Sequence, residues 1–126
     1  MELTERALVQ AAGAVARLRT AAGRHAVATA VLSADGRVFT GVDVRHDAAG
    51  ACAEVVAVGT AATQGVRELS AIVTVGDRGR ELREPCPGCR RLLADWFPGI
   101  RVVLGTPDEL RAVPVEELAA GQSPAA

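Results

Sequence analysis

The sequence contains no lysine and no tyrosine, and aromatic residues make up only 2% of it. Its 14 basic residues are therefore all arginines, and 15 acidic residues balance them to a net charge of −1. Proteins that bind polynucleotides need basic patches for the phosphates and aromatic side chains on which bases stack. Because this sequence has no basic stripe and few aromatic residues, we expect no polynucleotide partner.

Long apolar runs are also absent. No stretch reaches the length of about 20 residues that a membrane-spanning helix needs, and the acidic start at residues 1–6 lacks the hydrophobic segment of a signal peptide. The three cysteines cannot all pair, and two of them form a C-x-x-C motif, which favours metal-bound thiolates over a disulfide framework. We therefore expect a cytoplasmic protein that does not bind membranes.

The length and composition are typical of one compact unit. The chain has 126 residues, of which 49% are hydrophobic, so it can build one core but is too short for two ordinary domains. With so few aromatic residues, that core must be made of Ala, Val and Leu. We expect a single domain over residues 1–120 and a flexible tail at 121–126.

Hydrophobic periodicity predicts alternating helices and strands. The predicted helices are 4–23, 51–64, 87–97 and a final turn or two at 115–120. The first of them should begin at Thr4 and bury a stripe that runs from Leu8 to Leu18. The predicted strands are 26–32, 37–44, 69–75 and 100–104, and Asp35-Gly36 should join the first two as a hairpin. The charged segment 76–84, which has two glycines, is expected to be a loop. This order predicts an α/β fold with three layers, α-β-α, around a mixed central sheet.

Two short motifs predict a catalytic zinc site. Cys52 lies in Cys52-Ala53-Glu54, and the other two cysteines lie in Pro85-Cys86-Pro87-Gly88-Cys89. Three protein ligands leave one tetrahedral position open for water, which is typical of catalytic zinc. A non-ligand Glu followed by P-C-x-x-C is the pattern of zinc-dependent base deaminases, including forms with three cysteine ligands. The sequence therefore predicts Zn²⁺ at Cys52, Cys86 and Cys89, with Glu54 as the catalytic proton carrier.

The surroundings of these cysteines support that interpretation. Both groups fall at predicted helix starts, whose free N–H groups stabilise thiolates. Arg90, which directly follows Cys89, is a candidate to donate hydrogen bonds to the metal-bound sulfurs. Taken alone, the C-x-x-C pair also fits a structural zinc site or redox chemistry, and a zinc-scaffolded binding protein is the non-enzyme alternative. Glu54 argues against these alternatives, because a carboxylate is costly to bury without a role.

The motifs resemble those of the cytidine deaminase superfamily, and within it the blasticidin-S deaminases most of all. The resemblance runs from about residue 27 to 104, and its specific segments are 35–42, 52–54, 85–90 and 95–100. It implies the cytidine-deaminase fold, zinc at the three cysteines, Glu54 as proton shuttle, and a homotetramer whose active sites borrow residues from neighbouring subunits. It also implies that the Ala53 N–H donates to a carbonyl oxygen of the base and that the Glu84 carbonyl accepts from the leaving amine.

The expected substrate contacts depart from the family pattern. Cytidine deaminases bind ribose with an Asn and a Glu at the positions of Asp43 and Arg45, and His25 replaces an aromatic residue that borders the substrate. Sites built to hydrogen-bond a hydroxyl discriminate strongly, so we expect poor activity on ordinary cytidine. The predicted enzyme is a zinc-dependent aminohydrolase of a cytosine-like or related small aminated heterocycle, as a free base or modified nucleoside. A blasticidin-S deaminase and a conventional cytidine deaminase are the alternatives.

Overall fold

The structure, a computed structural model, describes residues 2–120, so the tail expected at 121–126 lies outside the described residues. Its strands are β1 (Val27–Ser33), β2 (Val38–Val42), β3 (Leu69–Gly76), β4 (Glu81–Arg83), β5 (Arg101–Thr106) and β6 (Glu109–Pro114). Its helices are α1 (Glu2–Arg19), α2 (Ala53–Thr63), α3 (Pro87–Trp96) and α4 (Val115–Ala120), with a 3-10 turn η1 (Asp77–Gly79). Every helix and strand predicted from periodicity is present.

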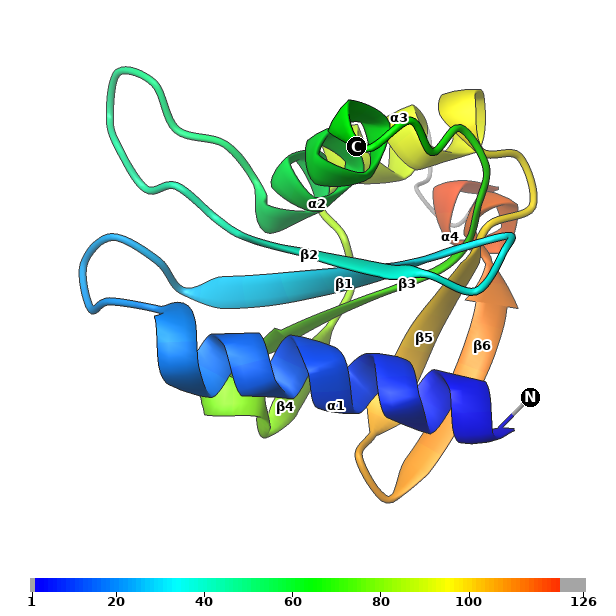
Figure 1. The fold of residues 1–126 in the computed structure, drawn as a ribbon, viewed down its shortest axis with the longest axis horizontal. Coiled ribbons are helices and arrows are strands. Elements are labelled where there is room, and N and C mark those ends of the chain that lie inside the picture. The colour runs from blue at the N-terminus through cyan, green and yellow to red at the C-terminus, as the bar shows by residue number, and fades with distance from the viewer. Residues whose placement is uncertain (1, 121–126) are drawn as a thin grey trace.

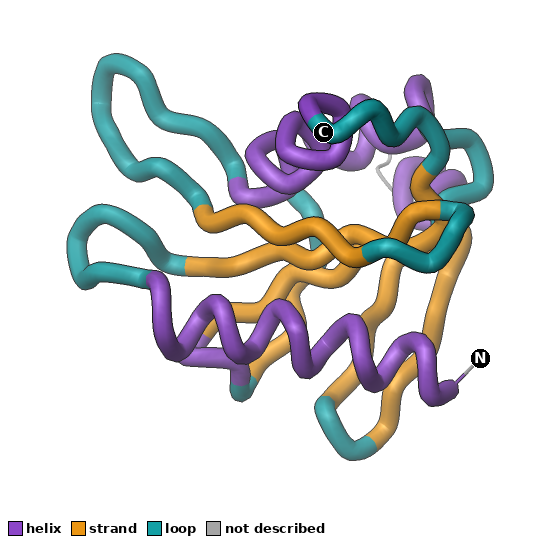
Figure 2. The backbone as a smooth tube through the Cα atoms, in the orientation of Figure 1, coloured by secondary structure: helices purple, strands orange, loops and turns teal. Residues whose placement is uncertain are grey.

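The strands form one mixed sheet with helices on both faces (Figures 1 and 2). The strand order is β2-β1-β3-β5-β6, and β4 pairs with the end of β3. Strands β3 and β5 run parallel, whereas the other neighbours run antiparallel. Helix α1 covers one face, and α2, α3 and α4 lie on the other (Figure 1). The predicted α/β fold with three layers and a mixed sheet is confirmed.

Side chains alternate along the central strands between two cores. On the α1 side, Ala28 and Ala30 of β1 pack beside Val73 of β3. On the other side, Val31 and Ile72 pack against α2 and α3. Both cores consist mainly of Ala, Val and Leu, as the composition predicts. The sheet thus separates the layer that carries α2 and α3 from the layer that carries α1.

Helix α1 differs from its prediction at both ends, and it begins at Glu2 rather than at Thr4. It stops at Arg19 rather than near Gly23, and Leu18 is 74% exposed instead of buried. The buried face of α1 includes Leu8, Ala12 and Ala16, which are spaced four residues apart. Leu18 follows Ala16 by two residues and so points to the opposite side of the helix. None of the helices within residues 2–120 combines the length and apolar character needed to cross a bilayer.

Two strands were not predicted. The segment 76–84 was expected to be a loop, but it contains η1 and the short strand β4. Strand β6 follows β5 in an antiparallel hairpin, and its residues are partly or fully exposed. Both segments carry charged residues where a central strand would carry apolar ones, so hydrophobic periodicity does not mark them.

Helix α2 lies against β2 at a position that only a glycine fits. A Cβ atom on Gly41 would come within 2.6 Å of the backbone nitrogen of Ala57, which is closer than van der Waals contact allows. The missing side chain therefore lets the backbone of α2 approach the edge of the sheet. This close contact fixes where α2 lies, and α2 begins at the cysteine motif.

Candidate active site

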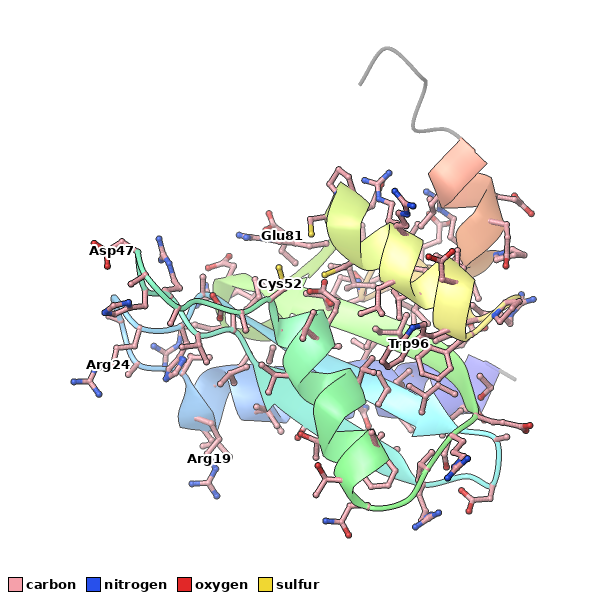
Figure 3. All side chains as sticks on the ribbon, turned by 90° about the horizontal axis from the view of Figure 1, so that it is seen from above. Arg19, Arg24, Asp47, Cys52, Glu81 and Trp96 are labelled. Carbon is pink, nitrogen blue, oxygen red and sulfur yellow. The ribbon has the colours of Figure 1, made fainter. Side chains whose placement is uncertain are left out.

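The three cysteines converge where α2 and α3 begin. Cys52 is the N-cap residue of α2, Cys86 is the N-cap residue of α3, and Cys89 lies in the first turn of α3. Their Sγ atoms all lie within 4.8 Å of one another, and those of Cys52 and Cys86 are 3.8 Å apart. Figure 3 shows Cys52 at the end of α2 that lies beside the start of α3. The fold thus brings together residues that are 34 positions apart in the sequence.

The sulfur geometry fits a tetrahedral zinc ion. Zn–S bonds of about 2.3 Å at tetrahedral angles place sulfur atoms about 3.8 Å apart. The Sγ atoms of Cys52 and Cys86 have this separation, and Cys89 completes a set of three within 4.8 Å. Three thiolates leave the fourth tetrahedral position open. The triad is therefore consistent with the predicted Zn²⁺, with one position left for a water or substrate atom.

The three thiols differ in acidity. Burial raises the pKa of Cys52 and of Cys89 above the ordinary thiol value. Burial also acts to raise the pKa of Cys86, but hydrogen bonds from the Cys89 backbone N–H and from the neighbouring thiols outweigh it and lower that pKa. Neither helix has a side-chain cap hydrogen bond, and the backbone N–H of Cys89 in the first turn of α3 is directed at the Cys86 sulfur instead. The metal-free protein therefore holds thiols that must lose protons when a metal binds.

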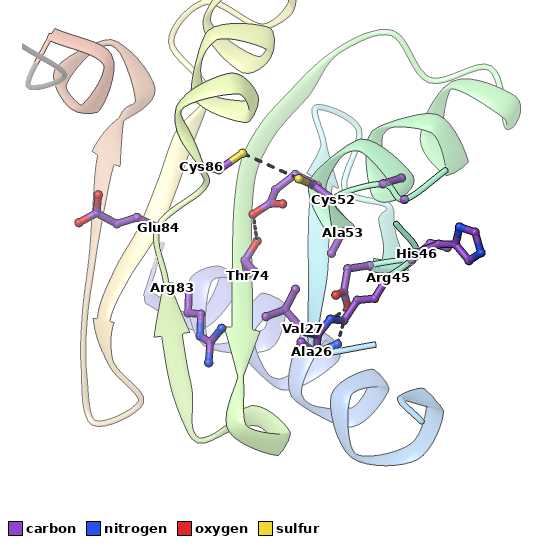
Figure 4. A pocket seen from close by; sticks show the side chains of 15 residues that line it. Ala26, Val27, Arg45, His46, Cys52, Ala53, Thr74, Arg83, Glu84 and Cys86 are labelled. Atoms are coloured by element: carbon purple, nitrogen blue, oxygen red, sulfur yellow. Dashed lines mark hydrogen bonds between the residues drawn. The ribbon is translucent and has the colours of Figure 1, made fainter. Parts of the chain in front are cut away.

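Glu54 lies beside the sulfur cluster in the first turn of α2 and is only 5% exposed. Its Oε1 atom is 3.8 Å from the Sγ atom of Cys89, and its Oε2 atom accepts a 2.8 Å hydrogen bond from the hydroxyl of Thr74. Figure 4 shows this bond next to the contact between Cys52 and Cys86. A buried carboxylate next to metal ligands can exchange a proton with a molecule held by the metal.

The cluster opens into a cleft of about 900 Å³. Ala53 lines the cleft, together with Asp43 and Arg45 from the segment that follows β2. His46 also belongs to the wall, but its ring points away from the cysteines (Figure 4). The described residues that line the cleft include no Phe, Tyr or Trp. The cleft can therefore admit a small ring, but its one described side-chain ring, the His46 imidazole, does not face the metal site.

The side chains of Asp43 and His25 form hydrogen bonds with backbone groups at the edge of the cleft. The Oδ1 atom of Asp43 accepts hydrogen bonds of 2.6 Å and 2.9 Å from the backbone N–H groups of Ala26 and Val27. His25 Nδ1 lies 2.7 Å from the carbonyl oxygen of Asp43, and His25 is not among the described residues that line the cleft. In this structure both residues tie the end of β2 to the start of β1.

Glu84 and Arg90 brace the loop that carries Cys86. The Arg90 guanidinium donates a 2.7 Å hydrogen bond to the carbonyl oxygen of Pro85 and lies 3.1 Å from a carboxylate oxygen of Glu84. Arg90 was expected to donate to the sulfurs, but these described contacts are with the loop instead. Glu84 lines the cleft, although its carboxylate points away from the cysteines (Figure 4).

Thr74 and Arg83 also line the cleft and were missed in the sequence. Thr74 stands in the apolar run of β3, where a single hydroxyl between Val73 and Val75 was a signal that could have been used. Arg83 lies in the segment expected to be a loop; its Nε atom donates a 2.7 Å hydrogen bond to Glu81. Pairing of β4 with β3 places Arg83 opposite Thr74, and periodicity does not predict that register.

Comparisons with known proteins agree with this geometry. Residues 1–106 match the family model described as the cytidine and deoxycytidylate deaminase zinc-binding region. The chain is similar to a blasticidin-S deaminase of Bacillus cereus, at 28% identity over 75% of this chain and 74% of that protein. It is also similar to a cytidine deaminase of Halalkalibacterium halodurans, at 33% identity over 78% of this chain and 76% of that protein.

Solved structures show the same fold. The crystal structure of cytidine deaminase from Mycobacterium leprae superposes with a TM-score of 0.73 and 28% identity, covering 90% of this chain and 95% of that chain. The cytidine deaminase from Bacillus anthracis gives a TM-score of 0.75 at 18% identity. The family match spans the cysteine motifs and the buried glutamate beside them. The chain therefore belongs to the cytidine and deoxycytidylate deaminase zinc-binding family and is a zinc-dependent deaminase.

Proposed function

We propose that this deaminase hydrolyses the exocyclic amino group of a cytosine-like or related small aminated heterocycle, as a free base or modified nucleoside, and acts poorly on ordinary cytidine. The observation that supports the chemistry most directly is the carboxylate of Glu54, which is 5% exposed and has one oxygen 3.8 Å from the Sγ atom of Cys89. A zinc site that only stabilised the fold would not need a buried acid beside it.

The roles of the residues follow from their positions. Cys52, Cys86 and Cys89 would hold the zinc ion. When bound, zinc would make water a nucleophile near neutral pH. Glu54 takes a proton from the attacking water and delivers protons to the ring nitrogen and to the leaving amine. The water oxygen becomes the carbonyl oxygen of the product, and the amino group leaves as ammonia.

Backbone groups orient the ring. The N–H of Ala53, in the first turn of α2, has no partner within the helix and lines the cleft, so it can donate to a carbonyl oxygen of the substrate. The carbonyl of Glu84 would accept from the amine that leaves, as the family resemblance implies. The contacts of Arg90 with Pro85 and Glu84 would hold that carbonyl in place.

The wall of the cleft favours a substrate other than cytidine. The Oδ1 atom of Asp43 already accepts two backbone hydrogen bonds, so a ribose hydroxyl would have to compete for this carboxylate. Arg45 also lines the cleft, and no ion pair within residues 2–120 involves it. Its guanidinium could meet a carboxylate of a modified nucleoside. His25 lies behind Asp43, where it would act on the substrate only through that residue.

Similarity to a blasticidin-S deaminase and to a cytidine deaminase keeps those two activities as the alternative candidates. A substrate panel separates all three. The zinc-loaded protein is incubated with cytosine, cytidine, aminated triazines and purines, and blasticidin S, and ammonia release is measured. We expect a free base or a modified nucleoside to give the highest kcat/KM. The highest kcat/KM on blasticidin S would assign the first of these alternatives. A kcat/KM on cytidine equal to or above that on every other compound would contradict the proposal, and no turnover with zinc bound would favour a binding protein.

Replacement of the proposed proton carrier tests the mechanism. Glu54→Gln keeps the size of the side chain and its ability to accept a hydrogen bond from Thr74, but it cannot take up a proton at neutral pH. We expect kcat to fall by about 100- to 10,000-fold with the zinc content unchanged, because general acid–base catalysis contributes about that factor. Turnover at the wild-type rate, measured together with metal analysis on the same sample, would show that another group moves the proton.

We also propose that the protein forms a homotetramer in which neighbouring chains complete the cleft. Two features support this arrangement. The described part of the cleft has no Phe, Tyr or Trp side chain, and helix α2, which begins at the zinc site, exposes Val55 at 43%. A partner chain packed on α2 would cover apolar surface and lie next to the cleft at once.

A further inference from the structure

We propose that Thr74, held by Thr29, is a positioning residue that fixes the carboxylate of Glu54 in the orientation used for proton transfer. This inference rests on the proposed role of Glu54. It concerns two side chains of the sheet that are not zinc ligands and to which the family match gives no role.

The two threonines lie directly opposite each other on neighbouring strands. Thr29 of β1 pairs with Thr74 of β3 in the antiparallel register. Their flanking residues, such as Ala28, Val73 and Val75, face the α1 core, so both hydroxyl-bearing side chains face α2 instead. Thr29 is 0% exposed and Thr74 is 4% exposed. Two hydroxyl groups are thus buried on the α2 side of the sheet, next to Glu54 in the first turn of α2.

The hydrogen bonds of this pair run in one direction. The Oγ1 atom of Thr74 is 2.8 Å from Oε2 of Glu54, and the Oγ1 atoms of Thr29 and Thr74 are 2.6 Å apart. Thr74 donates its one hydroxyl proton to Oε2 of Glu54, so it has none left for Thr29. Thr29 must then donate to Thr74. The chain Thr29 to Thr74 to Glu54 is therefore ordered and ends on the carboxylate.

This chain determines which carboxylate oxygen is free to react. Within residues 2–120, two side-chain donors contact Glu54, namely the hydroxyl of Thr74 and the thiol of Cys89. A thiol that ligates a metal has lost its proton, so Cys89 no longer donates once the site is loaded. Thr74 then remains to hold Oε2, and Oε1 stays directed at the metal site. Such fixed orientation contributes to catalysis because small misplacements of a reacting group are costly.

A purely structural role predicts a different pattern. Facing threonines also stabilise a sheet by about 0.2–1 kcal/mol as an ordinary cross-strand pair. If that were their only effect, replacing a hydroxyl with a methyl group would change stability and leave kcat unchanged. A positioning role instead predicts that kcat falls when the hydroxyl at position 74 is removed and is retained when serine supplies a hydroxyl there.

The test compares Thr74→Val, which keeps the shape and removes the hydroxyl, with Thr74→Ser, which keeps the hydroxyl. We measure kcat and KM on the best substrate of the panel, the zinc content and the melting temperature. For Thr74→Val we expect kcat to fall about 10- to 100-fold, the range for a hydrogen bond to a charged group, with KM and zinc content unchanged. Thr74→Ser should stay near wild type, and Thr29→Val should show a smaller loss of kcat because the bond to Glu54 remains.

Thr106→Val is the matched control. Thr106 ends β5, its hydroxyl accepts a hydrogen bond from the backbone of Glu109, and it does not line the cleft. This variant should keep the wild-type kcat. Thr74→Ala, which cannot overpack the core, replaces the valine variant if that protein does not fold.

Wild-type kcat in the folded hydroxyl-free variant, or an equal loss in Thr74→Ser, would overturn the proposal. The result for Glu54→Gln separates this failure from failure of the mechanism. An inactive Glu54→Gln with a normal Thr74→Val rejects only the positioning role, whereas an active Glu54→Gln rejects both.

Discussion

Protonation of individual thiols governs how the zinc site is loaded. The pKa of Cys52 and that of Cys89 are raised by burial, whereas that of Cys86 is lowered by hydrogen bonds from its neighbours. The lowered pKa of Cys86 makes its proton easier for a metal ion to displace than an ordinary thiol proton. The other two sulfurs bind only if the metal displaces their protons.

We expect the apparent zinc affinity of the metal-free protein to rise with pH, by about two to three orders of magnitude per pH unit, because each protonated ligand must release its proton. The raised pKa values of Cys52 and Cys89 mean that proton competition persists above neutral pH. Competition titration with a chromophoric chelator at several pH values measures this slope. Cys52→Ser should bind zinc more weakly and show a smaller slope, because one of the thiols that must release a proton is then missing. An affinity independent of pH would contradict the assignment of thiol ligands.

The zinc ligands and Glu54 could be predicted from the sequence because metal coordination restricts both residue type and spacing. The threonine pair could not, because threonine is an ordinary strand residue and only the register brings Thr29 opposite Thr74. Adjacency also misled in one case. Arg90 follows a ligand in sequence, yet the described contacts of its guanidinium are with the loop before Cys86.

At the scale of elements, the position of α2 depends on its contact with β2. The backbone of α2 at Ala57 lies where a side chain on Gly41 would be. Because Cys52 caps this helix and Glu54 lies in its first turn, any shift of α2 also moves a zinc ligand and the proposed proton carrier. The edge strand therefore influences the site without touching it.

Gly41→Ala tests this coupling. Its Cβ would lie 2.6 Å from the backbone nitrogen of Ala57, so we expect a loss of about 1–3 kcal/mol in the free energy of unfolding, as for other overpacked positions. Urea unfolding of the zinc-loaded protein measures this loss. Gly13→Ala in α1 is the control. Its Cβ would meet the flexible tip of Arg17 at 3.2 Å and the Cα of Gly79 at 3.9 Å, an ordinary contact, so the greater helix propensity of alanine should leave stability equal or higher. Equal effects of the two substitutions would exclude a special contact at Gly41.

The long elements were predictable and the short ones were not. The pattern over many residues identified α1, which buries one stripe, and β3, whose apolar side chains are buried on both faces of the sheet. Strand β4 has three residues, two of them charged and exposed, and it forms only because β3 offers a free edge there. Strand β6 is held by the β5 hairpin in the same way. Such elements depend on their partners more than on their own residues.

At the scale of the whole molecule, helix α2 carries apolar residues on its outer side, which the rest of the chain leaves exposed. Ala57, Val58 and Ala61 face the core, whereas Val55 and Ala62 lie on the outer side and are exposed. A helix that is apolar all round is normally buried on all sides. The outer side of α2 is therefore the surface on which we expect another copy of the chain to pack.

Val55→Glu should break this contact. A carboxylate on the outer side of α2 cannot be buried against a partner without a large desolvation cost, so we expect smaller species and lower activity. Light scattering coupled to size-exclusion chromatography gives the mass of each species. Leu18→Glu is the matched control, since Leu18 is 74% exposed on α1, across the sheet from α2. A protein that is already monomeric, or an unchanged oligomer in Val55→Glu, would exclude assembly through α2.

The fluorescence of Trp96 reports on this surface. It is the only tryptophan of a sequence without tyrosine, it is 63% exposed, and it lines a groove with Val58 and Ala62 of α2. Indole emission moves to shorter wavelength when water leaves the ring. Association of two chains over this groove would therefore shift the emission maximum to shorter wavelength without any added dye. A dilution series would follow the dissociation of subunits in real time.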